Sequence, residues 1–241
     1  MKKIISSLLV CLSILVFTGC GSTGKFVYPA KMSSLIQIDS EPVLNKRVAV
    51  LPFDDYRSDE NSCWFPLYLI PLMPFSWGDY ERPDAASMFL SIVKYDITPS
   101  EDLAKATAVS LRHSNIFQDT FFTMGGEKQN ADFILTGRIK MLKYKGKMFT
   151  YCLSVYGPIF WIFGAPAGMS ENRIALELQL KNKQGKVLWD WAIDKEEWIV
   201  QWLYARMGHD CKMFAQMYQD GMNDAMNNLA KRIRERPDLF K

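Results

Sequence analysis

The sequence predicts a single α/β domain, in which helices pack on a mixed sheet. Three observations predict this class: a β-branched run at residues 47–53 (RVAVLPF), a capped helical pattern at residues 98–115, and a second strand pattern at residues 131–142. Strand, helix and strand therefore recur in order. The chain of 241 residues is long enough for one sizeable core, and no internal repeat divides it.

The first 19 residues have the pattern of a bacterial secretory signal. Two lysines precede an apolar run at residues 4–17, which ends at Gly19 and Cys20. Small residues directly before a cysteine resemble the lipobox of bacterial lipoproteins, in which that cysteine is acylated and becomes the first mature residue. Cys20 is therefore the predicted lipidation site. An ordinary signal peptide or an uncleaved anchor is the alternative.

This N-terminus predicts a protein of the cell envelope that is held on a membrane through acylated Cys20. Gly21 resembles the residue that follows the cysteine in Gram-negative outer-membrane lipoproteins, so we expect the outer membrane, facing the periplasm. Two or three acyl chains attach a protein stably, whereas one chain is marginal. Residues 20–45 show no sustained period and contain two prolines, so we expect an acylated tether before a domain at residues 46–241.

The charge balance argues against a nucleic-acid partner. The 29 basic residues include two lysines that leave with the signal, so 27 basic side chains remain beside 26 acidic ones. A chain so close to neutral lacks the basic surface that nucleic acids require. The basic cluster at residues 231–236 falls at the end of a predicted helix, where cations complement the helix dipole. A patch for anionic lipid is the alternative.

Further elements follow along the chain. Residues 88–97 alternate in part and are compatible with a strand. Residues 98–101 (TPSE) fit a capping box with proline at the first helical position, so a helix should begin there and end at Asn115. Residues 117–124 are short and β-prone. The segment therefore predicts two strands with one helix between them.

The C-terminal third predicts a hairpin and a long helix. Residues 174–180 alternate, residues 182–185 form a turn, and residues 187–198 alternate again. An apolar stripe predicts a helix at about residues 210–234, with Asp210 as its N-cap. This helix should lie on the sheet.

Three motifs resemble a known group of envelope lipoproteins. They are VAVLPF at residues 48–53 with an acidic turn after it, EDLAKATAVSLRHSNIF at residues 101–117, and ADFILTGRI at residues 131–139. The combination looks like the α/β lipoproteins that include the curli-secretion channel subunit, activators of penicillin-binding proteins, and the Tol N-terminal domain. The resemblance implies a shared fold over residues 46–142. Channel-forming members insert alternating strands into the membrane, which residues 151–169 do not resemble, so no pore is expected.

No residue pattern points to a chemical activity. His113 falls at the end of a predicted helix, and His209 beside Asp210 lacks partners at a recognised metal-ligand spacing. No nucleophile elbow, zinc-protease motif or phosphate loop is present. We therefore expect no enzyme, no cofactor and no metal site, with an envelope hydrolase or transferase as the least favoured alternative.

Two apolar stretches set this chain apart, at residues 63–77 (CWFPLYLIPLMPFSW) and 151–169 (YCLSVYGPIFWIFGAPAGM). Prolines and glycines interrupt both, so neither predicts a helix that spans a bilayer. We read them as a pair of loops or hairpins from one domain, which either touch a membrane or partner or cover their own sheet. The candidate contact residues are Trp64, Phe65, Leu67, Tyr68, Trp77, Tyr156, Ile159, Phe160, Trp161 and Phe163.

Cysteines suggest a link between the two stretches. Cys63 and Cys152 each open one stretch, and a disulfide between them would fit an oxidising envelope. Free thiols are the alternative, because spacing does not fix connectivity. The sequence as a whole predicts a non-enzymatic accessory lipoprotein of envelope assembly or export, with an envelope protein as partner. A carrier of lipid or acyl chains, in which the stretches wall a cavity, is the alternative.

Overall fold

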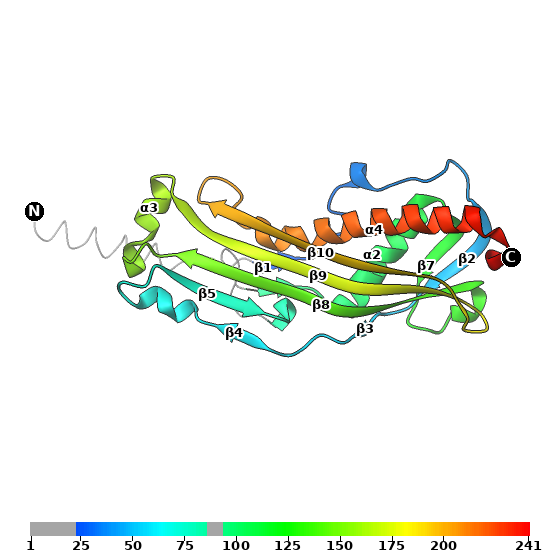
Figure 1. The fold of residues 1–241 in the computed structure, drawn as a ribbon, viewed down its shortest axis with the longest axis horizontal. Coiled ribbons are helices and arrows are strands. Elements are labelled where there is room, and N and C mark those ends of the chain that lie inside the picture. Colours follow the sequence, from blue (N-terminus) through cyan, green and yellow to red (C-terminus); the bar gives the residue numbers. More distant parts are fainter. Residues whose placement is uncertain (1–22, 86–93) are drawn as a thin grey trace, which may run out of the picture.

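The computed structural model describes residues 23–85 and 94–241 of an elongated molecule (Figure 1). An eight-stranded mixed sheet runs along its length, and two of its helices lie against the sheet. The predicted α/β class is confirmed. The helices are α2 (Pro99–Ser114), α3 (Pro158–Ile162) and α4 (His209–Glu235). The strands are β1 (Thr23–Lys25), β2 (Leu44–Val50), β3 (Asp54–Asp55), β4 (Asn61–Cys63), β5 (Phe75–Tyr80), β6 (Lys94–Asp96), β7 (Phe117–Phe122), β8 (Phe133–Phe149), β9 (Pro166–Asn182) and β10 (Val187–Trp202).

Strand β8 organises the sheet. One edge of β8 pairs antiparallel with β9 along almost its whole length, and β9 pairs in turn with β10. The other edge pairs successively with β2, β3 and β5. The first half of β8 therefore belongs to the compact α/β part, with β2, β7 and helix α2. Its second half extends, with β9, β10, β5 and β4, into a long antiparallel end.

The core lies between the sheet and helices α2 and α4. Val48, Leu135 and Leu178 are fully buried on the sheet, and Leu111 and Met222 are fully buried on the two helices. Tyr218 of α4 donates its hydroxyl to the carbonyl oxygen of Leu103 in α2 at 2.9 Å. Apolar residues at helical spacing on both helices thus meet the alternating residues of the strands, which is what their patterns predict.

Helix α2 begins and ends where the sequence predicts, but its cap differs. Pro99 occupies the first turn, and Asn115 adopts a left-handed φ of 55° at the C-terminal end. The Thr98 side chain makes no capping bond. The Asp102 carboxylate instead accepts the Thr98 backbone N–H at 2.7 Å, and Glu101 pairs with Lys105. The predicted capping box is therefore wrong in its partners. Asp102, one residue after the expected Glu101, accepts the Thr98 N–H.

Several other element boundaries differ from the predictions. Helix α4 begins at His209 after Gly208, so Asp210 lies inside the helix and is not its N-cap. Strands β8, β9 and β10 extend well beyond the predicted ranges because apolar and polar residues keep alternating there. Of the strand expected at residues 88–97, the structure describes residues 94–97, which include β6, and the rest lies outside the described residues.

The N-terminal segment, residues 23–43, packs along the domain, and the expectation of a tether is wrong for these residues. Strand β1 pairs with β6. Gln219 of α4 accepts the Lys31 N–H at 3.0 Å and donates to the Lys31 carbonyl at 2.7 Å, while Asn223 donates to Ser34 at 2.7 Å. The side-chain amides of α4 therefore provide hydrogen-bond partners for backbone groups of a segment whose sequence has no strand or helix periodicity. Cys20 lies outside the described residues.

Candidate functional site

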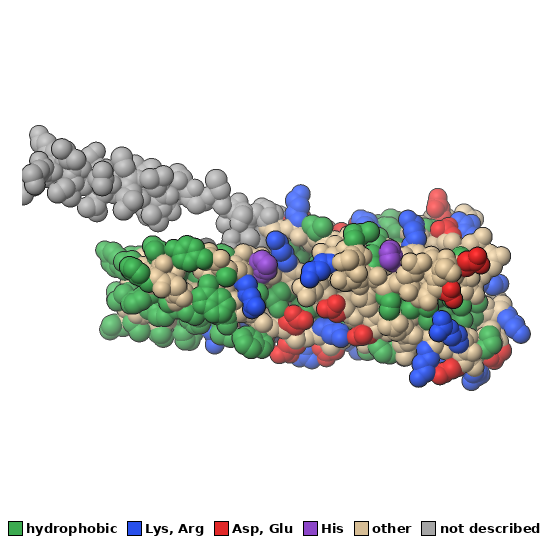
Figure 2. Space-filling view, turned by 90° about the horizontal axis from the view of Figure 1, so that it is seen from above, with side chains coloured by type: hydrophobic (Ala, Val, Ile, Leu, Met, Phe, Trp, Pro, Cys, Tyr) green, Lys and Arg blue, Asp and Glu red, His purple; other side chains and the backbone are tan. Residues whose placement is uncertain are grey.

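Hydrophobic side chains gather at one end of the molecule, on the left of Figure 2. Three segments form this end, residues 61–78, 148–170 and 198–205, and we call them together the apolar tip. None of them contains a charged side chain. Charged residues resume at once on either side, for example at Lys147 and Arg206. The tip is therefore a bounded apolar surface on an otherwise charged molecule.

The first apolar stretch forms part of the hairpin of β4 and β5. The Trp64 N–H bonds to the Trp77 carbonyl at 2.8 Å, and the two indole rings lie 6.2 Å apart. A 3-10 turn, η2 (Phe65–Leu69), connects the strands, and the Phe65 ring packs over Gly78, where a Cβ would lie 3.0 Å from the ring. Prolines at residues 66, 71 and 74 exclude a longer helix.

The second stretch connects β8 to β9 through two short helices, η5 (Ser154–Tyr156) and α3. The Tyr151 hydroxyl donates to the Pro166 carbonyl at 2.7 Å, and its ring lies 5.1 Å from that of Phe160. Tyr151, Cys152 and Ser154 all have left-handed φ values, between 53° and 63°. Non-glycine residues rarely adopt this conformation, and such strain concentrates at functional sites.

The two stretches lie side by side, as a pair. The Pro74 carbonyl accepts the N–H groups of Thr150 at 3.0 Å and Tyr151 at 3.2 Å. The Leu72 N–H bonds to the Cys152 carbonyl at 3.1 Å. Two loops that are distant in sequence therefore share backbone hydrogen bonds and form one surface.

The predicted contact residues divide into three groups. Phe65 and Trp161 are buried and hold the tip together, so they do not belong to its outward-facing surface. Leu67, Tyr68 and Trp77 are partly exposed, and burial raises the pKa of the Tyr68 hydroxyl. The exposed members are Trp64, Tyr156, Ile159, Phe160 and Phe163, of which Phe163 has 83% of its surface in solvent.

Sequence reasoning missed part of this surface. Within the two stretches, Leu72 is 81% exposed and Ile162 is also exposed. The third segment was not foreseen, and it contributes exposed Trp198, Leu203 and Tyr204. The Tyr204 hydroxyl donates to the Ile162 carbonyl at 3.2 Å. The uncharged run at residues 198–205 was the signal that could have identified this segment.

An apolar groove opens between the two stretches, with a volume of about 570 Å³. Its walls come from η2 on one side and from β8 and α3 on the other, and no charged side chain lines it. A groove of this size and character suits an apolar ligand. The lining residues are Cys63, Phe65, Pro66, Tyr68, Leu69, Met148 and Trp161.

The predicted disulfide between Cys63 and Cys152 is wrong, because both thiols are free and exposed. Cys63 pairs with Gly78, which pairs with Gly146 of β8. Cys63 is thus two strand spacings, about 10 Å, from β8. Cys152 lies beyond the end of β8, six residues after Gly146. Disulfides require Cα atoms less than about 7 Å apart, so this register separates the two cysteines.

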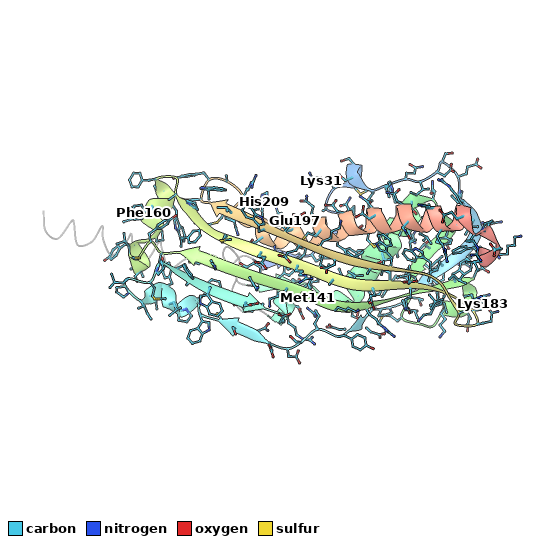
Figure 3. All side chains as sticks on the ribbon, in the orientation of Figure 1. Lys31, Met141, Phe160, Lys183, Glu197 and His209 are labelled. Atoms are coloured by element: carbon cyan, nitrogen blue, oxygen red, sulfur yellow. The ribbon has the colours of Figure 1, made fainter. Side chains whose placement is uncertain are left out.

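Basic side chains stand behind the tip on the side of helix α4. Arg206 and His209 are exposed, and Figure 3 shows His209 between Phe160 of the tip and the rest of the molecule. Lys212 and Lys25 line one hollow of about 270 Å³. Lys25 pairs with Asp96 at 3.8 Å, whereas Asp210 is buried. Basic side chains therefore gather on this side of the tip, with Asp96 and Glu197 beside them.

The described residues provide no metal site, since no group of three His, Cys, Asp or Glu side chains among them is close enough to hold an ion. His113 lies near the Ile36 carbonyl, with Nδ1 3.4 Å from the oxygen. Within residues 23–85 and 94–241, no helix is sufficiently long and apolar to cross a bilayer.

Comparisons with known proteins give only distant likenesses. No family model matches the chain, and no curated protein matches its sequence. Protein XCC0632 from Xanthomonas campestris, of the family model DUF330, has a TM-score of 0.43 and 9% identity, with 91% of this chain and 99% of that chain covered. The PelC dodecamer from Paraburkholderia phytofirmans has a TM-score of 0.35 and 16% identity, over 77% and 93% of the two chains. A neuraminyllactose-binding hemagglutinin homologue from Helicobacter pylori has a TM-score of 0.32 and 10% identity, over 86% and 90%. These scores are too low to bear on function.

Proposed function

We propose that this chain is a non-enzymatic accessory lipoprotein of the cell envelope. In this proposal acylated Cys20 attaches it to the periplasmic face of the outer membrane, and the apolar tip docks on a membrane or a membrane partner during assembly or export. The observation that carries the proposal is the concentration of exposed apolar and aromatic side chains at one end. Soluble proteins rarely leave so large an apolar surface without a partner.

Two further observations support the proposal. The lipobox pattern at Gly19 and Cys20 predicts attachment, and the motifs at residues 48–53, 101–117 and 131–139 resemble those of envelope lipoproteins. The tip is also internally bonded, so it presents a formed surface. Preformed surfaces lose less conformational entropy on binding than mobile loops do.

A second candidate function is a carrier of lipid or acyl chains, which the groove between the two stretches favours. Its volume and uncharged lining suit an acyl chain. Native mass spectrometry after mild extraction separates the candidates. A carrier retains stoichiometric lipid, and Met148→Lys in the groove wall removes it; an accessory protein that docks through the outer surface of the tip retains none.

The experiment that tests the leading proposal is metabolic labelling with a fatty-acid probe in a Gram-negative host. We expect the full chain to carry the label, to fractionate with the outer membrane, and to lose the label in Cys20→Ala. The matched control is Cys11→Ala, which lies inside the predicted signal and should leave labelling unchanged. A mature chain without acyl mass would refute the proposed attachment.

A further inference from the structure

We propose that the apolar tip inserts into the same membrane leaflet that holds acylated Cys20, so that the molecule stands end-on on the bilayer. The inference deepens the proposed function and rests on it, because it requires Cys20 to be acylated. It adds an occupant for the tip, the lipid leaflet itself, and an orientation. Both follow from where the N-terminal segment lies in the fold.

The N-terminal segment runs along helix α4, and its start points toward the tip (Figure 1). Tyr28 packs against Tyr218 of α4, with ring centroids 5.8 Å apart. Lys25, three residues before Tyr28, lines the same hollow as Lys212. Lys212 is six residues before Tyr218 and so lies nearer the start of α4. The start of α4 adjoins the tip, because the Gly208 N–H bonds to the Gln201 side chain at 2.9 Å. The chain therefore enters the described structure from the side of the tip.

The distance between anchor and tip is short. Cys20 lies three residues before Thr23, a connection that spans at most about 11 Å. Tyr144 of β8 donates to Asp210 in the first turn of α4 at 3.2 Å. Tyr144 is five residues before Phe149, the end of β8, or about 17 Å. The connection is therefore long enough for acylated Cys20 to reach the level of the strand ends, and the loops of the tip lie beyond that level.

The surface chemistry of the tip matches the interface of a leaflet. Exposed aliphatic side chains such as Leu72 and Ile162 lie with exposed aromatic ones such as Trp64 and Tyr204, the combination that membrane-interface surfaces use. Behind them on the anchor side lie the cations Lys25, Arg206 and Lys212, with His209. Two acids lie with them, Asp96, which pairs with Lys25, and Glu197, which is opposite Asn172, whose side chain bonds to the Asp210 carbonyl. Such cations attract anionic headgroups.

Attachment through acylated Cys20 favours contact of the tip with the leaflet over contact with a distant partner protein. A group attached to a surface through a short connection meets that surface at an effective concentration in the millimolar range. The leaflet that holds the acyl chains is therefore the first apolar phase that the tip encounters. Insertion into it needs no rearrangement of the tip, because both stretches are already fixed by hydrogen bonds.

The two free cysteines of the tip provide the test. The acylated mature chain, which begins at Cys20, is added to protein-free vesicles of phosphatidylethanolamine and phosphatidylglycerol. A water-soluble maleimide is then applied, with peptide mapping to resolve each site. We expect Cys63 and Cys152 to react at least about tenfold more slowly than in a soluble reference, residues 20–241 carrying Cys20→Ala, which lacks both the acyl chains and the apolar signal. Lys183→Cys, at the far end of the molecule in Figure 3, should react at the same rate in both states.

A charged tip provides the second arm. Leu72→Asp with Phe163→Asp places carboxylates on the two most exposed tip residues, so the fold should persist and labelling of Cys63 and Cys152 should recover by about tenfold, because carboxylates do not enter hydrocarbon. Met124→Asp, at an exposed apolar residue outside the tip, is the matched control and should leave the protection intact.

The outcomes separate this inference from the function on which it rests. A chain without acyl mass refutes both. An acylated chain whose two cysteines react as fast as Lys183→Cys refutes the insertion alone and leaves the accessory lipoprotein standing. Protection in native outer membranes but not in protein-free vesicles also refutes it, because a protein then covers the tip.

Discussion

Trp161 donates its indole N–H to the carbonyl oxygen of Phe149 at 3.0 Å. The bond joins helix α3 of the second apolar stretch to the last residue of β8, and Trp161 is itself buried. The exposed residues of the tip therefore stand on a fixed base. This separation between residues that hold the tip and residues that face outward makes each group testable by itself.

Trp161→Phe tests the base of the tip. The substitution keeps an aromatic ring but removes the donor, and it leaves the Phe149 carbonyl without this partner. We expect the free energy of unfolding to fall by about 1–2 kcal/mol, measured by urea denaturation. Trp64→Phe is the control, since Trp64 is half exposed and should change stability by less than about 0.5 kcal/mol. Equal effects from both substitutions would contradict the assignment.

Phe163→Ala tests the outward-facing surface. Phe163 is almost fully exposed, so its loss should leave unfolding unchanged. Burial of a phenylalanine in an apolar phase is worth about 1.5–3 kcal/mol, so partition into vesicles should weaken by about tenfold or more. The measurement is cosedimentation of residues 20–241 carrying Cys20→Ala, in which neither acyl chains nor the apolar signal mask the contribution of the tip. Met124→Ala should partition like the parent, and an unchanged Phe163→Ala would exclude this residue from contact.

Gly137→Ala tests the packing of the central strand. A Cβ on Gly137 of β8 would lie 2.7 Å from the Phe53 ring, which is buried. The ring must shift within a packed core, so we expect a loss of about 1–3 kcal/mol in thermal or urea unfolding. Gly126→Ala is the control, because nothing lies within 4 Å of its Cβ position. A Gly137→Ala protein as stable as the parent would show that Phe53 relaxes freely.

Asp55→Asn tests an ion-pair cluster and its pH dependence. The Arg57 side chain, only 1% exposed, bonds to Asp55 at 2.8 Å and to Asp84 at 2.6 Å. Hydrogen bonding from Arg57 lowers the pKa of Asp55, against the opposing effect of burial. The folded pKa lies below the unfolded one, so this stabilisation is complete above about pH 4 and is lost as the pH falls through the folded value.

We therefore expect Asp55→Asn to lower the free energy of unfolding by about 1–3 kcal/mol at neutral pH, and by progressively less in acid. Urea denaturation across the acid range provides the measurement. The exposed pair partner Asp238 offers a control, since Asp238→Asn should follow the parent at every pH. A constant difference between parent and Asp55→Asn at all pH values would argue against an ionised Asp55 in the cluster.

Tyr28→Phe tests attachment of the N-terminal segment in alkali. Burial raises the pKa of Tyr28 from 10.0 to about 12, with the Ser110 hydrogen bond opposing. The neutral hydroxyl is thus favoured in the folded state, and the stabilisation is complete below pH 10 and is lost as the pH rises toward 12. We expect the parent to lose stability over this window more steeply than Tyr28→Phe. Thermal unfolding at a series of pH values measures the difference, and parallel curves would contradict it.

The α/β class and helix α2 were predictable because their signals are local. Residues 47–53 are a β-branched run, and Pro99 and Asn115 mark helix ends through their own backbone preferences. The extension of β8 to Phe149 was also visible in principle. Lysines at residues 143, 145 and 147 alternate with residues that face inward, which is the period of a strand.

Other features depend on contacts that no local pattern reveals. The backbone of the N-terminal segment bonds to Gln219 and Asn223, almost 190 residues away, and its own sequence has no period. The third segment of the tip, with Leu203 and Tyr204, joins the others only because β10 lies beside β9. Likewise, the separation of Cys63 from Cys152 follows from strand register, which spacing in the sequence does not determine.

The length of β8 determines how far the molecule extends from the membrane. Its 17 residues rise by about 56 Å from one end of the strand to the other. In the end-on orientation the connection between β9 and β10, at residues 183–186, is therefore held some five nanometres above the lipid, somewhat more than the thickness of a bilayer with its headgroups. A partner bound at that end would meet the protein deep in the aqueous compartment, while the attachment to lipid remains at the opposite end.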